Sequence, residues 1–358
     1  MAVAVEDFKR ACEVLAGGRA VLCVSHTRPD GDAIGSVLGL RALLRTRGLR
    51  VTALMLDPPT PRYAWLLDDD PPAIWTRDQA AVRGEAFDAV LIADTASARQ
   101  LEPVLGYLES LAAPRIIVDH HATRDVAAHV ALIDETAAAT CELILEWAEA
   151  LDWPVPPEAA EALFTGLATD TGWFRFPSVD ERAMRAAQRL VAMGADPHRV
   201  YERLYAQESA ARLRLTAAML ATLELRAGGR LAVVELIRDA FRRCGATPAD
   251  TEELVNEPAR IGGVEVVLLF VEQEDGQVRV SFRSKPPAGG LNRPFGPGLD
   301  VAALAAEFGG GGHARAAGAR IRGSLPEVRR QVIARVESEL LRSADARHDL
   351  SGLRTRPT

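Results

Sequence analysis

The stretch His26-Thr-Arg-Pro-Asp-Gly-Asp32 places three metal-binding side chains close together: His26, Asp30 and Asp32. It follows an apolar run (20–24) that is typical of a buried strand, and a helical apolar pattern begins at Ala33. Imidazole and carboxylate groups at this spacing could form one wall of a metal site. Pro-Asp-Gly is also an ordinary turn sequence, so this segment alone leaves both interpretations open.

Three further segments deliver an Asp or a His at the same kind of place. Asp94 ends the run VLIAD, and Asp119, His120 and His121 end the run RIIVDHH. Asp170 lies in GLATDTGWF, where a helical pattern ends. Asp94 alone could cap a helix and Asp170 alone could close one, but consecutive histidines after an apolar strand are hard to explain by packing. The joint occurrence predicts a metal centre.

The ligand types indicate which metal would suit. The candidates are carboxylates and imidazoles without a thiolate, a set that favours Mn²⁺ or a similar divalent ion over structural zinc. An EF-hand is excluded because Arg41 stands where that loop, counted from Asp30, requires a glutamate. The carboxylates are too many for one ion, so we expect two divalent ions that share a carboxylate. Two such ions lower the pKa of a shared water, which suits in-line attack on phosphorus.

The elements that must position these residues form an α/β pattern. Short apolar runs alternate with helical patterns, which predicts a parallel sheet with helices on both faces. Ligands of such sheets sit at the carboxyl ends of the strands, where the candidate residues lie. The expected strands are 20–24, 51–56, 87–95 and 115–121, and the expected helices between them are 33–47 and 98–112.

After residue 136 the alternation of short apolar runs and helical patterns stops. Residues 137–226 are expected to be mostly helical, and a smaller α/β domain follows. The active site is expected in the cleft between the two domains. The expected elements of the smaller domain are strands 231–236, 264–272, 277–284 and 318–322, a loop at 285–298, and helices 300–308 and 325–342. The predicted organisation is a catalytic domain (1–192), a helical linker (193–226), a substrate-binding domain (227–342) and a disordered tail (343–358).

Composition excludes several classes of protein. The 358 residues carry a net charge of −7, so no basic stripe for long duplex DNA is expected. Neither lysine, Lys9 or Lys285, follows a glycine, which argues against a phosphate-binding P-loop. The four cysteines fit neither a zinc spacing nor a disulfide framework, which favours a reducing compartment. With no signal peptide or membrane span apparent, we expect a cytoplasmic protein.

These motifs resemble a known family. HTRPDGDAIGS, IADT, VDHH and ATDTGWF, in this order, are similar to the four motifs of the DHH phosphoesterases. SFRSK (281–285) and GGGGHARAAG (309–318) are similar to the DHH-associated domain. The architecture most resembles the small bacterial oligoribonucleases (nanoRNases) that also dephosphorylate 3′-phosphoadenosine 5′-phosphate (pAp). RecJ-type nucleases are larger, and family II pyrophosphatases end without GGGGH.

The resemblance implies a role for each site residue. Asp119 would orient a histidine, and His121 would face the phosphate as a clamp or proton donor. The implied metal ligands are His26 and Asp30 for one ion, Asp32, His120 and Asp170 for the other, and Asp94 as the bridge between them.

The expected substrate-binding residues lie in the second domain. Consecutive glycines let the backbone approach a phosphate, although they could also be a linker, and an arginine on a strand could simply face solvent. Among the aromatic residues, Trp173, Phe174 and Phe176 could stack a base or belong to the core. The expected phosphate-binding set is Arg283, Ser284, Gly310, Gly311, Gly312, His313 and Arg315.

The sequence thus predicts a Mn²⁺-dependent phosphoesterase that degrades very short oligonucleotides to nucleoside monophosphates and converts pAp to AMP. Donors that grip a terminal phosphate at a fixed distance from the metals would act as a ruler and confine activity to short chains. One alternative is a phosphodiesterase for cyclic or linear dinucleotides such as c-di-AMP, pApA or pGpG. Another is a non-catalytic nucleotide-binding module. The resemblance also makes a homodimer plausible, and the long 285–298 loop bears on substrate preference.

Overall fold

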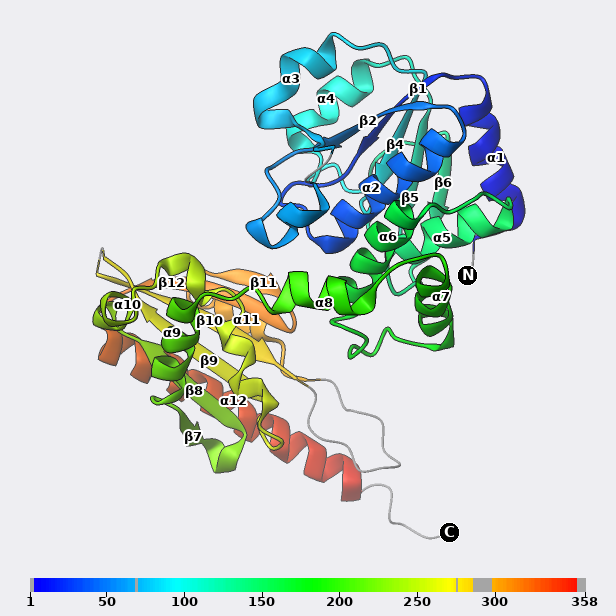
Figure 1. Ribbon diagram of the computed structural model, residues 1–358. Coiled ribbons are helices and arrows are strands. Elements are labelled where there is room, and N and C mark those ends of the chain that lie inside the picture. Colours follow the sequence, from blue (N-terminus) through cyan, green and yellow to red (C-terminus); the bar gives the residue numbers. More distant parts are fainter. Residues whose placement is uncertain (1–2, 68–69, 275, 286–297, 353–358) are drawn as a thin grey trace, which may run out of the picture. The chain divides into compact units, whose positions relative to one another are not determined.

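The computed structural model describes residues 3–67, 70–274, 276–285 and 298–352. The chain divides into two compact units, Met1–Gln207 and Glu208–Thr358, which we call the N-terminal and C-terminal units (Figure 1). The predicted domain boundaries at 192 and 227, and the predicted cleft, stay predictions. Among the described residues no helix combines the length and the apolar character that crossing a bilayer requires.

The N-terminal unit is built on a sheet of six parallel strands, as the alternating pattern predicts. The strand order is β3-β2-β1-β4-β5-β6. All residues of β1 and β4 are buried, which is why these strands are continuous apolar runs. The strands are β1 (Ala20–Val24), β2 (Arg50–Met55), β3 (Ala73–Ile74), β4 (Ala89–Ala93), β5 (Arg115–Asp119) and β6 (Val130–Ile133).

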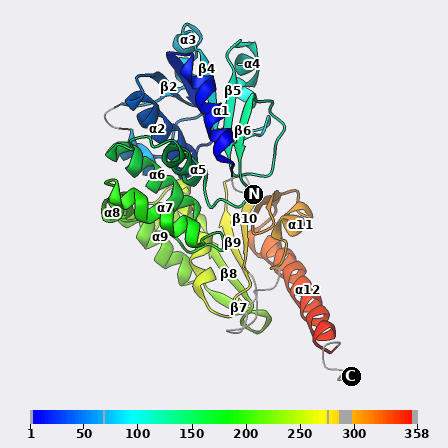
Figure 2. The ribbon, with the colours of Figure 1, turned by 90° about the vertical axis from the view of Figure 1, so that its right-hand side faces the viewer.

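Helices cover both faces of this sheet (Figures 1 and 2). Val21 and Cys23 of β1 pack with α1, α2, α5 and α6, whereas Leu22 and Val24 pack with α3 and α4 on the opposite face. The helices are α1 (Val5–Ala16), α2 (Gly31–Thr46), α3 (Trp75–Arg83), α4 (Glu102–Ser110), α5 (Thr140–Ala150), α6 (Pro157–Asp170), α7 (Glu181–Ala192) and α8 (Pro197–Tyr205).

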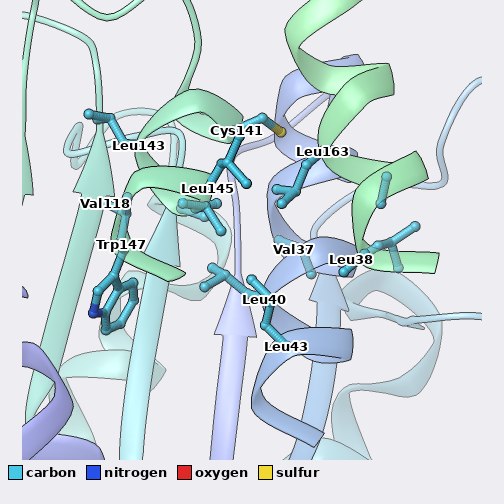
Figure 3. Packing of buried hydrophobic residues seen from close by; sticks show 14 of the residues in the cluster. Val37, Leu38, Leu40, Leu43, Val118, Cys141, Leu143, Leu145, Trp147 and Leu163 are labelled. Atoms are coloured by element: carbon cyan, nitrogen blue, oxygen red, sulfur yellow. The ribbon is translucent and has the colours of Figure 1, made fainter. Parts of the chain in front are cut away.

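The packing of α2 against α6 brings the site together. A Cβ at Gly35 would lie 2.4 Å from the carbonyl oxygen of Ala162, so only a glycine lets the two helices approach this closely. The end of α6 lies beside the start of α2, because a Cβ at Gly31 would meet the Thr169 side chain. Figure 3 shows Val37, Leu40 and Leu43 of α2 facing the apolar side chains of α5 and α6.

The C-terminal unit is the smaller α/β domain that the pattern predicts. Its sheet has the order β11-β12-β10-β9-β8-β7, with only β8 and β9 parallel. Helices α11 and α12 pack on one face of this sheet and α9 and α10 on the other. Its elements are α9 (Ala210–Leu220), β7 (Glu224–Arg226), β8 (Leu231–Leu236), α10 (Arg238–Cys244), β9 (Val266–Glu272), β10 (Gln277–Ser284), α11 (Val301–Ala306), β11 (Gly311–His313), β12 (Ala316–Arg322) and α12 (Leu325–Gly352).

Several elements differ from the sequence expectation. The sequence pattern missed β3, β6, β7 and β11, because strands of two to four residues carry too little periodicity. The last helix continues past the expected end at 342 to Gly352, through part of the expected tail. Residues 353–358 of that tail and residues 286–297 of the expected 285–298 loop lie outside the described residues.

Candidate metal centre

Three neighbouring strands deliver candidate ligands to one edge of the sheet. His26 follows β1, Asp94 follows β4 and Asp119 is the last residue of β5. Because β4 pairs with both β1 and β5 in parallel, the carboxyl ends of these strands meet at the same edge. Asp94 adopts a left-handed backbone conformation with φ of 62°. Such strain in a non-glycine residue is common at functional sites.

The opening motif has a structural role at the start of α2, and its part in a metal site stays a prediction. Asp30 is the N-cap of α2, and its Oδ1 accepts hydrogen bonds of 3.1 Å from the backbone N–H groups of Asp32 and Ala33. This cap fixes the first turn of the helix and thereby the direction of the Asp32 side chain. A turn residue thus also helps to shape the predicted site.

The six predicted metal ligands gather into two groups, with His26, Asp30 and Asp94 in one and Asp32, His120 and Asp170 in the other. Asp94 also forms a third group with His120 and His121. His26 Nε2 lies 3.3 Å from Asp94 Oδ2 and 4.0 Å from Asp30 Oδ1. His120 Nε2 lies 3.6 Å from Asp170 Oδ2, 3.9 Å from Asp32 Oδ2 and 3.7 Å from Asp94 Oδ1.

Asp94 belongs to the first group and also faces the histidine of the second. Its Oδ2 faces His26 and its Oδ1 faces His120, so each oxygen of one carboxylate points toward a different group. That is the arrangement a carboxylate bridging two cations requires.

Both histidines are oriented by backbone carbonyls. His26 Nδ1 lies 2.8 Å from the carbonyl oxygen of Thr27, and His120 Nδ1 lies 3.2 Å from that of Ala137. A carbonyl oxygen only accepts, so each Nδ1 carries the proton. Each Nε2 therefore presents its lone pair to the carboxylates, as a metal ligand must.

The raised pKa values of two carboxylates indicate that this site suits a cation. Burial, together with the charges of Asp32, Asp30, Asp170 and Asp119, raises the pKa of Asp94 well above its ordinary value. Burial and the Asp32 charge likewise raise the pKa of Asp170 to about 7. A divalent ion would remove this repulsion, so the residues present fit divalent cations.

Asp119 and His121 form a hydrogen-bonded pair beside Asp94 and His120. Asp119 is fully buried, and its Oδ1 accepts hydrogen bonds from His121 Nδ1 at 2.8 Å and from the His121 backbone at 3.1 Å. This hydrogen bond raises the pKa of His121. The His121 ring is half-exposed, and its Nδ1 lies 3.7 Å from Asp94 Oδ1.

The predicted phosphate-binding residues lie in the C-terminal unit. Arg283 Nε donates to Asn256 Oδ1 at 3.0 Å, whereas the Ser284 hydroxyl donates to the Leu299 carbonyl at 2.6 Å. Ser284 therefore ties backbone segments together. Gly311, Gly312 and His313 form β11, which pairs with β12, and His313 and Arg315 are exposed.

The glycine run has a packing role that sequence reasoning missed. A Cβ at Gly310 would lie 2.2 Å from the Gly318 carbonyl oxygen, whereas a Cβ at Gly311 would meet open space. A hollow of about 370 Å³ lies beside Gly310, lined also by Arg279, Ser281 and Arg320. Close approach of β11 to β12 therefore requires Gly310 whether or not a phosphate binds.

Both units match known domains. Residues 20–167 match the DHH family, N-terminal domain, and residues 228–341 match the DHHA1 domain. The chain contains a DHH domain and a DHHA1 domain. The DHH match spans the N-terminal strands and five of the six predicted metal ligands, and the DHHA1 match spans β8 to β12 with the glycine run.

Full-length relatives share this architecture. The chain is 29% identical to the bifunctional oligoribonuclease and PAP phosphatase NrnA of Thermus thermophilus, over 94% of this chain and 96% of the relative. It is 27% identical to NrnA of Bacillus subtilis, over 83% of this chain and 87% of the relative. An exopolyphosphatase-related protein from Bacteroides fragilis has the same fold, with a TM-score of 0.83, 23% identity and coverage of 94% of this chain and 98% of that chain.

Proposed function

We propose that this chain is a phosphoesterase that uses two divalent metal ions, Mn²⁺ first among them. It would release nucleoside monophosphates from very short RNA and phosphate from pAp. The observation that carries this proposal is the pair of ligand groups with Asp94 between them, one oxygen facing His26 and the other facing His120. The relatives from Thermus thermophilus and Bacillus subtilis, named for both activities, supply the substrate class.

The residues of the DHH domain have complementary roles in this proposal. When bound, two divalent ions supply a water of lowered pKa and neutralise phosphoryl charge. His26, Asp30, Asp32, His120 and Asp170 would hold the ions, and Asp94 would set the distance between them. Asp119 would keep the Nε2 atom of His121 directed at the substrate phosphate. A protonated His121 could then donate a proton to the leaving oxygen.

The DHHA1 domain would bind the end of the substrate. Arg283 keeps donors beyond its bond to Asn256, and the exposed His313 ends β11, with the exposed Arg315 two residues later. Charged donors of this kind suit a terminal phosphate. A phosphate gripped by one domain and hydrolysed by the other would confine activity to short chains.

The aromatic residues after Asp170 divide into two roles. Trp173 and Phe174 pack against the core, and Trp173 lies edge-on to Tyr201 with ring centres 5.0 Å apart. Phe176 is half-exposed. Phe176 is therefore the aromatic residue of this turn that is able to stack a nucleobase.

The test is hydrolysis of RNAs of increasing length and of pAp, with Mn²⁺ and with chelator. Wild type should cleave only the shortest RNAs, and the chelator should abolish activity. Asp94→Ala should lower kcat at least about 1,000-fold, because it removes the carboxylate that faces the histidines of both ligand groups. Asp7→Ala, which removes a carboxylate of α1 paired with Arg10, should match wild type.

Other outcomes would contradict separate parts of the proposal. Equal rates on long and short RNA would contradict the length limit set by phosphate binding, but not the proposed hydrolysis. Full activity of Asp94→Ala would overturn the metal centre. If wild type binds metal but hydrolyses neither any RNA nor pAp, cyclic dinucleotides become the substrates to test.

A further inference from the structure

One buried turn, residues 137–141 between β6 and α5, contacts the predicted ligands from three other elements. The backbone N–H groups of Thr140 and Cys141 donate to the two oxygens of Asp32, at 2.6 and 3.0 Å. The Thr140 hydroxyl donates to Asp94 Oδ1 at 2.9 Å. Two carboxylates that belong to α2 and to the end of β4 are therefore oriented by the same turn.

The turn also orients the histidine of the second group. The Ala137 carbonyl accepts the hydrogen bond from His120 Nδ1 that directs Nε2 toward Asp32 and Asp170. The turn lacks a side-chain cap of the usual kind, because the N-cap residue of α5 is Ala139. Side chains outside the turn must therefore hold its conformation.

Glu142 and Arg182 supply that support. Glu142 is fully buried, and its Oε2 accepts a 2.6 Å hydrogen bond from the Ala138 backbone, inside the turn. Its other oxygen lies 3.4 Å from Arg182 Nε. Arg182, from the first turn of α7, also binds Glu146 of α5 through two bonds of 2.6 Å and Asp134 through one of 2.7 Å.

We propose that Glu142 and Arg182 are positioning residues for the metal centre, which clamp the turn 137–141 so that it holds Asp32, Asp94 and His120 in ligand geometry. Neither residue belongs to a ligand group. Their effect passes through the turn: the charge of Arg182 attracts Glu142 without a hydrogen bond to it, Glu142 accepts from the backbone of Ala138, and that backbone orients the ligands. The inference rests on the proposed function in taking these three residues as metal ligands.

The charges around the clamp agree with a geometric role. Arg182 is one cation among three carboxylates: Asp134, Glu142 and Glu146. The hydrogen bonds that Arg182 donates to Glu146 raise the pKa of Arg182, so its charge is permanent. A guanidinium held by two elements at once is rigid, which suits a residue that must hold a backbone turn in place.

The deciding experiment measures Mn²⁺ binding by titration calorimetry on the full-length protein without substrate. Glu142→Ala should weaken Mn²⁺ affinity by about 10- to 100-fold, the usual effect of removing a group that orients metal ligands. Glu142→Gln should stay near wild type, because its amide oxygen still accepts from Ala138. Arg182→Lys should lose affinity to a lesser extent than Glu142→Ala, because it cannot bind Glu146 and Asp134 together.

The matched control is Glu149→Ala. Glu149 pairs with Arg189 at 2.8 Å and so links the same two helices, α5 and α7, away from the turn. It should leave Mn²⁺ affinity unchanged, although it removes a comparable ion pair. Thermal unfolding of every variant separates loss of metal affinity from loss of stability.

Two results would overturn the clamp: unchanged Mn²⁺ affinity in Glu142→Ala, or an equal loss in Glu149→Ala. If Glu142→Ala does not fold, Arg182→Lys decides, and wild-type affinity in that variant would contradict the proposal. Failure of wild type itself to bind Mn²⁺ would instead overturn the proposed function.

Discussion

At the scale of single residues, the N-terminal unit is unusual for the number of carboxylates it keeps away from water. Asp32, Asp94, Asp119, Asp134 and Glu142 are all buried. Asp32 and Asp94 face the predicted cation sites, whereas Asp134 and Glu142 face Arg182. The chain thus neutralises some buried charge internally and leaves the rest for divalent ions.

Glu142 gives a prediction for stability as a function of pH. Its pKa is raised to about 7, chiefly by burial and further by Glu146 and Asp180, against lowering by the Ala138 bond and Arg182. Between the ordinary pKa of a glutamate and this value, the folded state holds a proton that the unfolded state has lost. The stabilisation is therefore complete at acid pH and is lost as pH rises through about 7.

Urea unfolding without metal at about pH 5 and about pH 8 tests this sign. Wild type should lose on the order of 2 kcal/mol more stability over that range than Glu142→Gln, which has no charge to bury. Asp94 and Asp170 also have raised pKa values, but they are present in both proteins and cancel in the comparison. An identical loss in the two proteins would contradict the prediction.

At the scale of elements, the hairpin of β11 and β12 and the glycines before it include a position fixed by packing and residues predicted to bind phosphate. Gly310 has no room for a side chain, because a Cβ would lie 2.2 Å from the Gly318 carbonyl oxygen. At Gly311 nothing lies within 4 Å of that position. The two glycines therefore serve different purposes, although they are adjacent in the sequence.

A pair of alanine variants separates these purposes. Gly310→Ala should destabilise the protein by about 1–3 kcal/mol, as overpacking does. Gly311→Ala should change stability by less than about 0.5 kcal/mol. It should still raise KM for short RNA if a phosphate approaches the β11 backbone. Chemical denaturation and steady-state kinetics measure the two effects, and equal destabilisation by both variants would contradict the assignment.

At the scale of the whole molecule, the predicted metal ligands and the predicted phosphate-binding residues belong to different units. Each unit has its own apolar cores: α2, α5 and α6 against one sheet, and α11 and α12 against the other. All six predicted metal ligands precede residue 208, and all predicted phosphate-binding residues follow it. Changes in one unit should therefore leave the binding function of the other intact.

Arg283→Ala tests this separation. Loss of a charged donor should raise KM for short RNA about tenfold or more, while Mn²⁺ affinity measured without substrate stays at the wild-type value. Asp32→Asn should do the reverse and weaken Mn²⁺ binding. Loss of Mn²⁺ affinity in Arg283→Ala would show that the units do not act independently.

The sequence predicted most of the candidate ligands because parallel strands make their positions readable. A buried strand is a continuous apolar run, so the residues at its end, such as Asp94 and Asp119, are marked by the change to polar character. The topology of a parallel sheet then brings such ends together. The sequence could therefore predict that these residues lie close to one another without knowledge of the side-chain packing. Short elements such as β3 and β11 left no pattern and were missed.

The sequence by itself determined the fold class, the two α/β regions and the residues that make up the two ligand groups, because these follow from local periodicity and from the ends of strands. Only the tertiary structure decided which oxygen of Asp94 faces which histidine, that Thr140 holds Asp32 and Asp94, and that Arg182 and Glu142 support the turn. The contacts of Thr140 and Cys141 with Asp32 and Asp94, and of Arg182 with Glu142, join residues 40 to 109 positions apart. Their partners are chosen by the close packing of α2, α5, α6 and α7, a property that no single segment of the sequence encodes.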